Sequence, residues 1–136
     1  MLFFESIEAH PADWSALIFK DKVITFGELR QTVDNWAAYL QTKGLQKGER
    51  VGLFSKNCPE FVAAYHAIVK AGGVVVPINF MLSPTETSFI IKDASVKMMF
   101  VQEVIDLEAA LAKRGCDPVE QITFAEISAA PEAVPA

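Results

Sequence analysis

Short apolar runs rich in β-branched residues alternate with segments of helical length along most of this chain, and this alternation constrains the fold more than any other feature. Strands that are separated by single helices pair in parallel through crossover connections. The predicted strands are residues 50–55, 74–78, 97–101 and 121–124, and the predicted helices between them are residues 59–71, 84–93 and 104–114. The sequence therefore predicts an α/β fold with a mainly parallel sheet, in which the β-branched run 74–78 is a buried strand.

A β-hairpin and an amphipathic helix are predicted before the first of these strands. Residues 16–19 and 23–25 flank a polar turn at residues 20–22, a pattern typical of a hairpin. Thr25 and Glu28 have the spacing of a capping box, in which each side chain accepts a hydrogen bond from the other residue's backbone amide. The helix that follows has one apolar face, formed by Phe26, Leu29, Val33, Trp36, Ala37 and Leu40.

Glycine, proline and capping residues mark the ends of the predicted helices. Gly44 follows the amphipathic helix, where a left-handed residue commonly ends a helix. Pro59 suits a first helical turn, because its missing N–H would have no partner there. Ser83 and Glu86 form a second capping box, with Pro84 at the first helical position. These residues lie where the apolar periodicity also changes, so the capping signals and the periodicity predict the same helix boundaries.

Length and composition fit one packed domain. A chain of 136 residues buries about two-thirds of its unfolded surface. Its last nine residues are rich in Ala and Pro and have no apolar period, so residues 1–127 are expected to form one α/β subdomain and residues 128–136 a linker or frayed tail. The mean hydropathy of +0.27 is high for a small soluble monomer. The predicted helices and strands do not account for this high mean hydropathy.

Charge and cysteine content exclude several classes of function. The net charge is −5, and the 12 Lys and Arg residues are scattered, with no basic run longer than Lys113–Arg114, so we expect no nucleic-acid partner. Cys58 and Cys116 make neither a disulfide framework nor a zinc motif. The chain has no signal-peptide start, and its longest uncharged stretch, residues 71–85, is broken by Gly and Pro. We therefore expect a cytoplasmic protein with reduced thiols and no transmembrane segment.

No phosphate-binding loop is present in the sequence. Such loops run from a strand through a glycine-rich turn to a helix N-terminus, where free N–H groups face the anion. Gly72 and Gly73 instead follow a helix and precede a strand, where carbonyl groups are exposed. We interpret this pair as a helix C-terminus with a tight turn.

Three residues of nucleophilic or basic type have structural interpretations that outweigh catalytic ones. Cys58 lies at a helix N-terminus, but His66 is two turns, about 11 Å, further along the same helix. His66 itself stands alone on an apolar helix, which is typical of a structural histidine. Ser55 ends a strand but lacks the G-x-S-x-G motif.

The remaining candidates are also assigned to structure. The acidic residues Glu103, Asp106 and Glu108 are expected to face solvent near a helix start, where they complement its dipole. Phe89, Phe100, Met98 and Met99 are expected to lie in the core. From the residues alone, we assign no catalytic, cofactor-binding or metal-binding residue to this chain.

A series of motifs resembles the N-terminal region of the adenylate-forming enzymes, the superfamily of acyl- and aryl-CoA synthetases, luciferases and peptide-synthetase adenylation domains. The matching segments are ITFGEL at 24–29, KGERV at 47–51, NCPEF at 57–61, VKAGGVVVPIN at 69–79, and Pro84 with Glu86. They occur in the family's order and spacing between about residues 16 and 101. Asn79 and Glu86 resemble the acyl-CoA synthetase branch, and a long-chain fatty acid–CoA ligase most of all.

The resemblance implies an activity for a longer parent protein. Such an enzyme uses ATP and Mg²⁺ to convert a carboxylic acid, here a fatty acid, to an acyl-adenylate, from which CoA displaces AMP. The family's Thr/Ser/Gly-rich phosphate loop, downstream Mg²⁺-associated Glu, ribose-binding Asp and catalytic Lys are all missing from these 136 residues. The resemblance therefore implies a scaffold segment that is inactive alone and whose partners are the remaining subdomains of the parent.

Two other interpretations stay open at this point. The chain could be a stand-alone binding module that keeps the scaffold without the enzyme, or an unrelated small nucleotide-binding α/β domain. The second is disfavoured by the helix-before-glycine order at Gly72. A subdomain separated from its neighbours would expose apolar surface, which would account for the high hydropathy and leads us to expect self-association.

Overall fold

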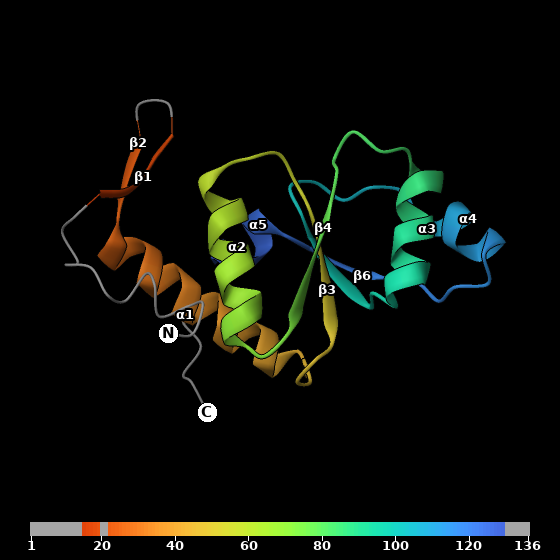
Figure 1. Cartoon of the computed structure of the whole chain (residues 1–136), viewed down its shortest axis with the longest axis horizontal. Coiled ribbons are helices and arrows are strands. Elements are labelled where there is room, and N and C mark those ends of the chain that lie inside the picture. Colours follow the sequence, from red (N-terminus) through yellow and green to blue (C-terminus); the bar gives the residue numbers. More distant parts are fainter. Residues whose placement is uncertain (1–14, 20–21, 130–136) are drawn as a thin grey trace.

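A four-stranded parallel sheet forms the centre of the molecule (Figure 1). The structure is a computed structural model that describes residues 15–19 and 22–129. The strands are β3 (Arg50–Phe54), β4 (Val74–Ile78), β5 (Met98–Val101) and β6 (Glu120–Thr123), and their spatial order is β4-β3-β5-β6. All three pairings are parallel, which confirms the predicted α/β fold.

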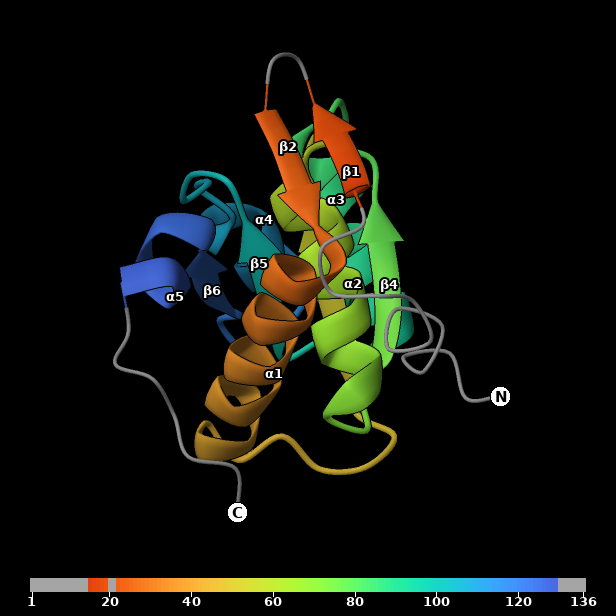
Figure 2. The same cartoon turned by 90° about the vertical axis from the view of Figure 1, so that its left-hand side faces the viewer.

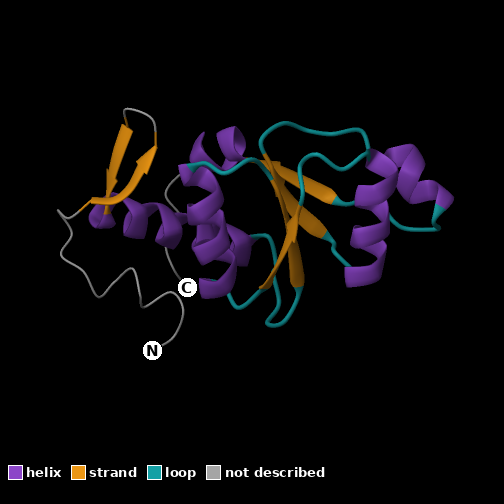
Figure 3. Ribbon diagram, turned by 45° about the horizontal axis from the view of Figure 1, so that its top comes forward, coloured by secondary structure: helices purple, strands orange, loops and turns teal. Residues whose placement is uncertain are grey.

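Helices cover both faces of this sheet (Figure 3). On one face lie α1 (Phe26–Thr42), α2 (Pro59–Lys70) and the short α5 (Phe124–Ala129). On the other lie α3 (Pro84–Ala94) and α4 (Glu108–Lys113). This doubly wound arrangement follows from the strand order. From β3 the chain passes through α2 to β4 on one side of β3, and it then returns through α3 to β5 on the other side of β3.

The predicted hairpin is present and stands apart from the main sheet. It comprises β1 (Ser15–Phe19) and β2 (Lys22–Thr25), which pair antiparallel. It projects beyond the first turn of α1 (Figure 2). Residues 20 and 21 of the expected turn lie outside the described residues. The capping box at the start of α1 is confirmed, with the Glu28 amide donating to Thr25 Oγ1 at 3.2 Å and the Thr25 amide donating to Glu28 Oε1 at 3.2 Å.

Two apolar cores lie on opposite faces of the sheet. The larger lies beneath α1, α2 and α5, where the rings of Trp36, Phe100 and Phe124 stack with centroids 5.9–6.0 Å apart. The smaller lies beneath α3 and α4 and includes Met99 and Leu111. The apolar face predicted for α1 is confirmed, since Leu29, Val33, Trp36, Ala37 and Leu40 are all buried.

Two burial predictions were wrong. Residues 74–78 form an edge strand rather than a buried one, and Val74 is 46% exposed. Phe89 is 57% exposed, because it faces outward from α3, where the Arg114 guanidinium lies 5.4 Å from its ring centroid. Phe100 and Met99 are fully buried as predicted, and Met98 is half-buried.

The helix predictions near the C-terminus also need correction. The expected helix 104–114 is reduced to α4, because Ile105 is held in an irregular segment: its N–H donates to Gln121 Oε1 at 2.9 Å and its C=O accepts from Gln121 Nε2 at 2.8 Å. The helix α5 was not predicted, and it contains residues 128 and 129, which the sequence placed in the tail. Residues 130–136 lie outside the described part of the chain, so the rest of the tail stays a prediction.

Candidate functional site

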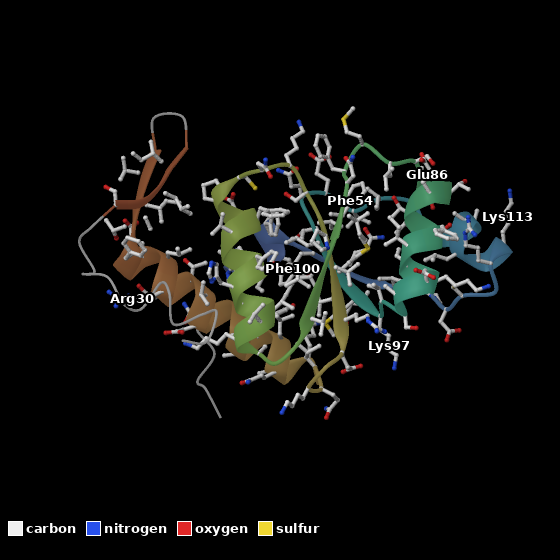
Figure 4. The ribbon with its side chains drawn as sticks, in the orientation of Figure 1. Arg30, Phe54, Glu86, Lys97, Phe100 and Lys113 are labelled. Atoms are coloured by element: carbon white, nitrogen blue, oxygen red, sulfur yellow. The ribbon has the colours of Figure 1, made fainter. Side chains whose placement is uncertain are left out.

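The most promising place for a site is the edge of the sheet where β3 and β5 end. From the carboxyl end of β3 the chain enters α2 on one face, and from β5 it passes to α4 on the other. Such a reversal opens a crevice between neighbouring strands, and ligands of α/β proteins bind there preferentially. Figure 4 shows Phe54, at the end of β3, and Glu86, in the first turn of α3, toward this same end of the molecule.

A shallow depression of about 390 Å³ lies at this edge. Its lining combines aromatic, charged and amide side chains: Phe54, Lys56, Phe80, Gln102, Glu103 and Ile105. The Lys56 amide donates to Gln102 Oε1 at 3.3 Å, which links the ends of β3 and β5. The Lys56 ammonium lies 5.7 Å from the centroid of the Phe80 ring, in cation–π range. The depression is therefore lined by one cation, one carboxylate and two phenylalanine rings.

Sequence analysis did not single out Lys56, Phe80 and Gln102. They come from three different connections, so no local spacing relates them. The one available signal was position, since each follows closely on the end of a predicted parallel strand. Of the residues considered in the sequence, Ser55 and Glu103 lie at this edge.

The structure gives Ser55 and Cys58 local roles. The Ser55 hydroxyl donates to the Lys56 carbonyl at 2.8 Å, and Ser55 Oγ lies 3.6 Å from Cys58 Sγ. Cys58 occupies the N-cap position of α2, but its side chain accepts no capping hydrogen bond. This pair closes the β3–α2 turn, in agreement with the structural interpretation.

His66 is nearly buried on α2, with its ring 6.4 Å from that of Tyr65 in an edge-on arrangement. Burial lowers the pKa of His66 below its usual 6.5, because the charged imidazolium is poorly solvated there. The imidazole is therefore neutral at pH 7. It belongs to the packing of α2, as the sequence predicted.

The acidic residues after β5 face solvent as expected. Glu103, Asp106 and Glu108 are all exposed. The Glu108 amide lies 3.4 Å from Asp106 Oδ1, so Asp106 helps to begin α4. Across the described ranges 15–19 and 22–129, no group of three or more His, Cys, Asp or Glu side chains is arranged to hold a metal ion.

The helix N-termini of the described chain do not fit the phosphates of ATP. At α1 and α3 the N-cap amide and the third helical amide are bonded to the chain's own Thr25–Glu28 and Ser83–Glu86 side chains, and each first turn carries a glutamate carboxylate. In α2 the first helical residue is Pro59, which has no N–H, and Glu60 adds negative charge to the first turn. We therefore derive no step of ATP chemistry through these residues.

Comparison with known proteins decides the family. The model of the family described as "AMP-binding enzyme" matches residues 3–134. This chain belongs to that family. The resemblance found in its motifs is thereby confirmed, and the family match extends on both sides of the motif region.

Individual relatives agree with this assignment. The chain is 33% identical over 103 residues to 4-hydroxybutyrate–CoA ligase 2 of Metallosphaera sedula, covering 76% of this chain and 19% of the relative. It is 31% identical over 115 residues to the long-chain-fatty-acid–CoA ligase of Bacillus subtilis, covering 85% and 20%. The chain thus spans about a fifth of the length of these curated relatives.

A solved structure shares the fold. The N-terminal subdomain of NpsA from Klebsiella oxytoca, in complex with 3-hydroxybenzoyl-AMSN, superposes with a TM-score of 0.79 at 24% identity. The match covers 95% of this chain and 31% of that one. The described helices include none with the length and apolar character to cross a bilayer.

Proposed function

We propose that this chain is the N-terminal portion of an ATP-dependent acid–CoA ligase that acts through an acyl-adenylate, with a fatty acid as its substrate. The observation that carries the proposal is the 31% identity over 85% of the chain to a protein named long-chain-fatty-acid–CoA ligase. In such a parent enzyme, ATP and Mg²⁺ activate the carboxylate and CoA thiol displaces AMP. Those groups are bound by residues outside this segment.

The family motifs in this chain build turns and helix starts. Asn79 Oδ1 accepts from the Met81 amide at 2.9 Å and its carbonyl accepts from the Leu82 amide at 3.0 Å, which turns the chain sharply after β4. Ser83 and Glu86 then cap α3. Gly72, at φ 94°, ends α2 in a conformation that other residues avoid. These contacts support a scaffolding role for the segment.

We further propose that the 136-residue chain alone has no adenylating activity. The sequence lacks the family's phosphate loop, and the first turns of α1 and α3 are capped by the chain's own side chains. We also propose that the parent enzyme is cytoplasmic, a location with which the free thiols Cys58 and Cys116 are compatible.

ATP–pyrophosphate exchange tests both the proposed activity of the parent enzyme and the proposed inactivity of the 136-residue chain alone. The purified chain is expected to show no acid-dependent exchange, and robust exchange would refute its inactivity. The full-length parent is expected to exchange with long-chain fatty acids and to form the CoA thioester. Exchange with 4-hydroxybutyrate but not fatty acids would refute the substrate, and no exchange with any acid would refute the function. A reading frame that ends at Ala136 would instead favour the stand-alone module.

A further inference from the structure

A small pocket lies where α1, the first turn of α2 and the end of α5 meet, on the side of the sheet that holds the larger core. Its volume is about 180 Å³, and it shares no lining residue with the depression at Lys56. Its lining includes Ile24, Leu29, Trp36, Pro59, Glu60 and Ala63. A cavity of about 150 Å³ holds a molecule of the size of benzene, so this pocket has room for a small organic ligand.

Trp36 brings a hydrogen-bond donor to this pocket. Only 4% of the residue is exposed, and its ring stacks on those of Phe100 and Phe124. A buried indole N–H ordinarily has an acceptor. Within residues 15–19 and 22–129, however, no acceptor is bonded to the Trp36 N–H. The N–H is not sealed inside the core, because the part of Trp36 that stays accessible lines the pocket. A ligand that satisfies the indole must therefore carry an acceptor.

Glu60 brings a carboxylate to the same pocket. It is half-buried in the first turn of α2. Among the described residues no cation forms an ion pair with Glu60, whereas Glu49 and Glu120 are both paired with lysines. A half-buried carboxylate beside apolar side chains is stabilised by a donor that enters the pocket with the ligand. The ligand must therefore carry a donor as well as an acceptor.

We propose that this pocket is a binding site for a small primary carboxamide. The carbonyl oxygen of the ligand accepts from the Trp36 N–H, its NH₂ group donates to the Glu60 carboxylate, and its apolar part packs against Leu29 and Ala63. One planar amide group supplies both the acceptor and the donors that these side chains need. The site goes beyond the proposed function and does not depend on it.

Two other ligand classes fit the pocket less well. A carboxylic acid, the substrate class of the proposed ligase, would place a second negative charge beside Glu60. An ammonium without an oxygen atom would pair with Glu60 but leave the indole N–H of Trp36 without an acceptor. The amide is favoured because it satisfies both groups at once.

Titration of isobutyramide into the 136-residue chain tests the site, with the indole N–H signal of Trp36 in heteronuclear NMR spectra as the reporter. The Trp14→Phe background leaves Trp36 as the chain's one tryptophan. The signal should shift saturably, with a Kd of roughly 1–10 mM for so small a ligand. Methyl isopropyl ketone replaces the NH₂ group by a methyl group, and isobutyrate replaces it by a charged oxygen. Each should bind at least about tenfold more weakly than the amide.

A pair of matched variants tests the part of Glu60. Glu60→Met keeps the length of the side chain and removes its acceptor, so isobutyramide should bind about tenfold more weakly. Glu108→Met removes an exposed carboxylate from the first turn of α4 and should leave the Kd unchanged. Circular dichroism checks that both variants keep the fold.

Five results would overturn the proposal. A Trp36 signal that stays in place up to about 100 mM isobutyramide would show that the indole binds no amide. Equal shifts with the amide, the ketone and isobutyrate would reveal apolar contact alone, and an unchanged Kd in Glu60→Met would remove the carboxylate from the site. Tighter binding of isopropylammonium than of isobutyramide would make the pocket a cation site. Binding by the chain but not by the full-length parent would assign the pocket to another segment of that parent.

Discussion

Substitution of Gly52 by alanine tests how tightly the centre of the sheet is packed. Gly52 lies in β3, between its partners Val76 and Met99 on the adjacent strands. A Cβ added there would lie 2.9 Å from Met99 Cβ and 3.3 Å from Ile78 Cδ1. Met99 Cβ is fixed by a backbone that is hydrogen-bonded to β3, so relief requires the strands to separate.

The expected cost follows from two opposing effects. Overpacking of this kind costs about 1–3 kcal/mol. Replacing glycine by alanine restricts the unfolded chain, which offsets about 0.4–1 kcal/mol of that cost. The free energy of unfolding of Gly52→Ala should therefore fall by roughly 1–2 kcal/mol. Urea titration followed by circular dichroism measures it, and the Tm should fall by about 4–8 °C. An unchanged or raised Tm would refute the packing argument.

Gly44 provides a control at which a substitution acts through backbone strain and not through overpacking. Its φ is +86°, and no atom lies within 4 Å of a Cβ added there. Gly44→Ala is expected to cost about 1 kcal/mol through backbone strain alone, and Gly44→Asn should recover most of that loss, because asparagine tolerates the left-handed conformation. At Gly52 the larger asparagine should be worse than alanine. Recovery by asparagine at both positions would show that contact with Met99 is not the cause.

Three further perturbations probe local contacts. Ser83→Ala removes the acceptor of the Glu86 amide, so unfolding in urea should show a loss of about 1 kcal/mol. Arg114→Met removes the donor to Ser88 Oγ at 2.7 Å, so the amides of α4 should exchange faster while those of α1 are unchanged. Burial holds the pKa of His66 below 6.5, so the unfolded chain binds its proton first and stability should fall as pH decreases below 6.5. His66→Asn should weaken that dependence between pH 7.5 and 5.5.

Each of these three predictions has a result that would contradict it. Equal stability of Ser83→Ala and the parent sequence would mean that the capping box contributes nothing to α3. Unchanged exchange in α4 would show that Arg114 does not hold the two helices together. An identical pH dependence in His66→Asn would assign the acid sensitivity to other groups.

Features set by neighbouring residues could be predicted from the sequence. The capping boxes join residues three apart, so their geometry depends on local backbone alone, and both are present. The parallel pairing of the strands could also be predicted, because a chain that leaves a strand through a single helix has few ways to return to the same sheet. The left-handed glycines at 44 and 72 likewise follow from helix termination.

Features set by residues that are distant in sequence could not be predicted from the sequence. The amide of Gln121 fixes Ile105 through two hydrogen bonds, and nothing near Ile105 in sequence indicates that its helix would begin later. The exposed Phe89 ring lies against the guanidinium of Arg114, the C-cap residue of α4, and this contact joins residues 25 apart in sequence. The depression at Lys56 also combines three connections, so only the folded sheet brings it together.

The helix α5 is a different case, since a local signal was present. Thr123-Phe124-Ala125-Glu126 repeats the pattern of Thr25-Phe26-Gly27-Glu28, and the Glu126 amide donates to Thr123 Oγ1 as in a helix start. Phe124 and Ile127 then form its buried side. Six residues are too few for an apolar period to emerge, so the capping motif was the one usable indicator.

The aromatic stack that joins α1 to the sheet has a consequence for synthesis on the ribosome. Trp36 emerges long before Phe100 and Phe124, the rings on which it packs. At ordinary translation rates of about 5–20 residues per second, about 4–18 s separate Trp36 from Phe124. During that interval the part of α1 that packs on Phe100 and Phe124 is not yet fully covered, although α2 and β3 emerge earlier. The nascent chain is therefore a natural client for chaperones that bind exposed apolar helices until the last strand arrives.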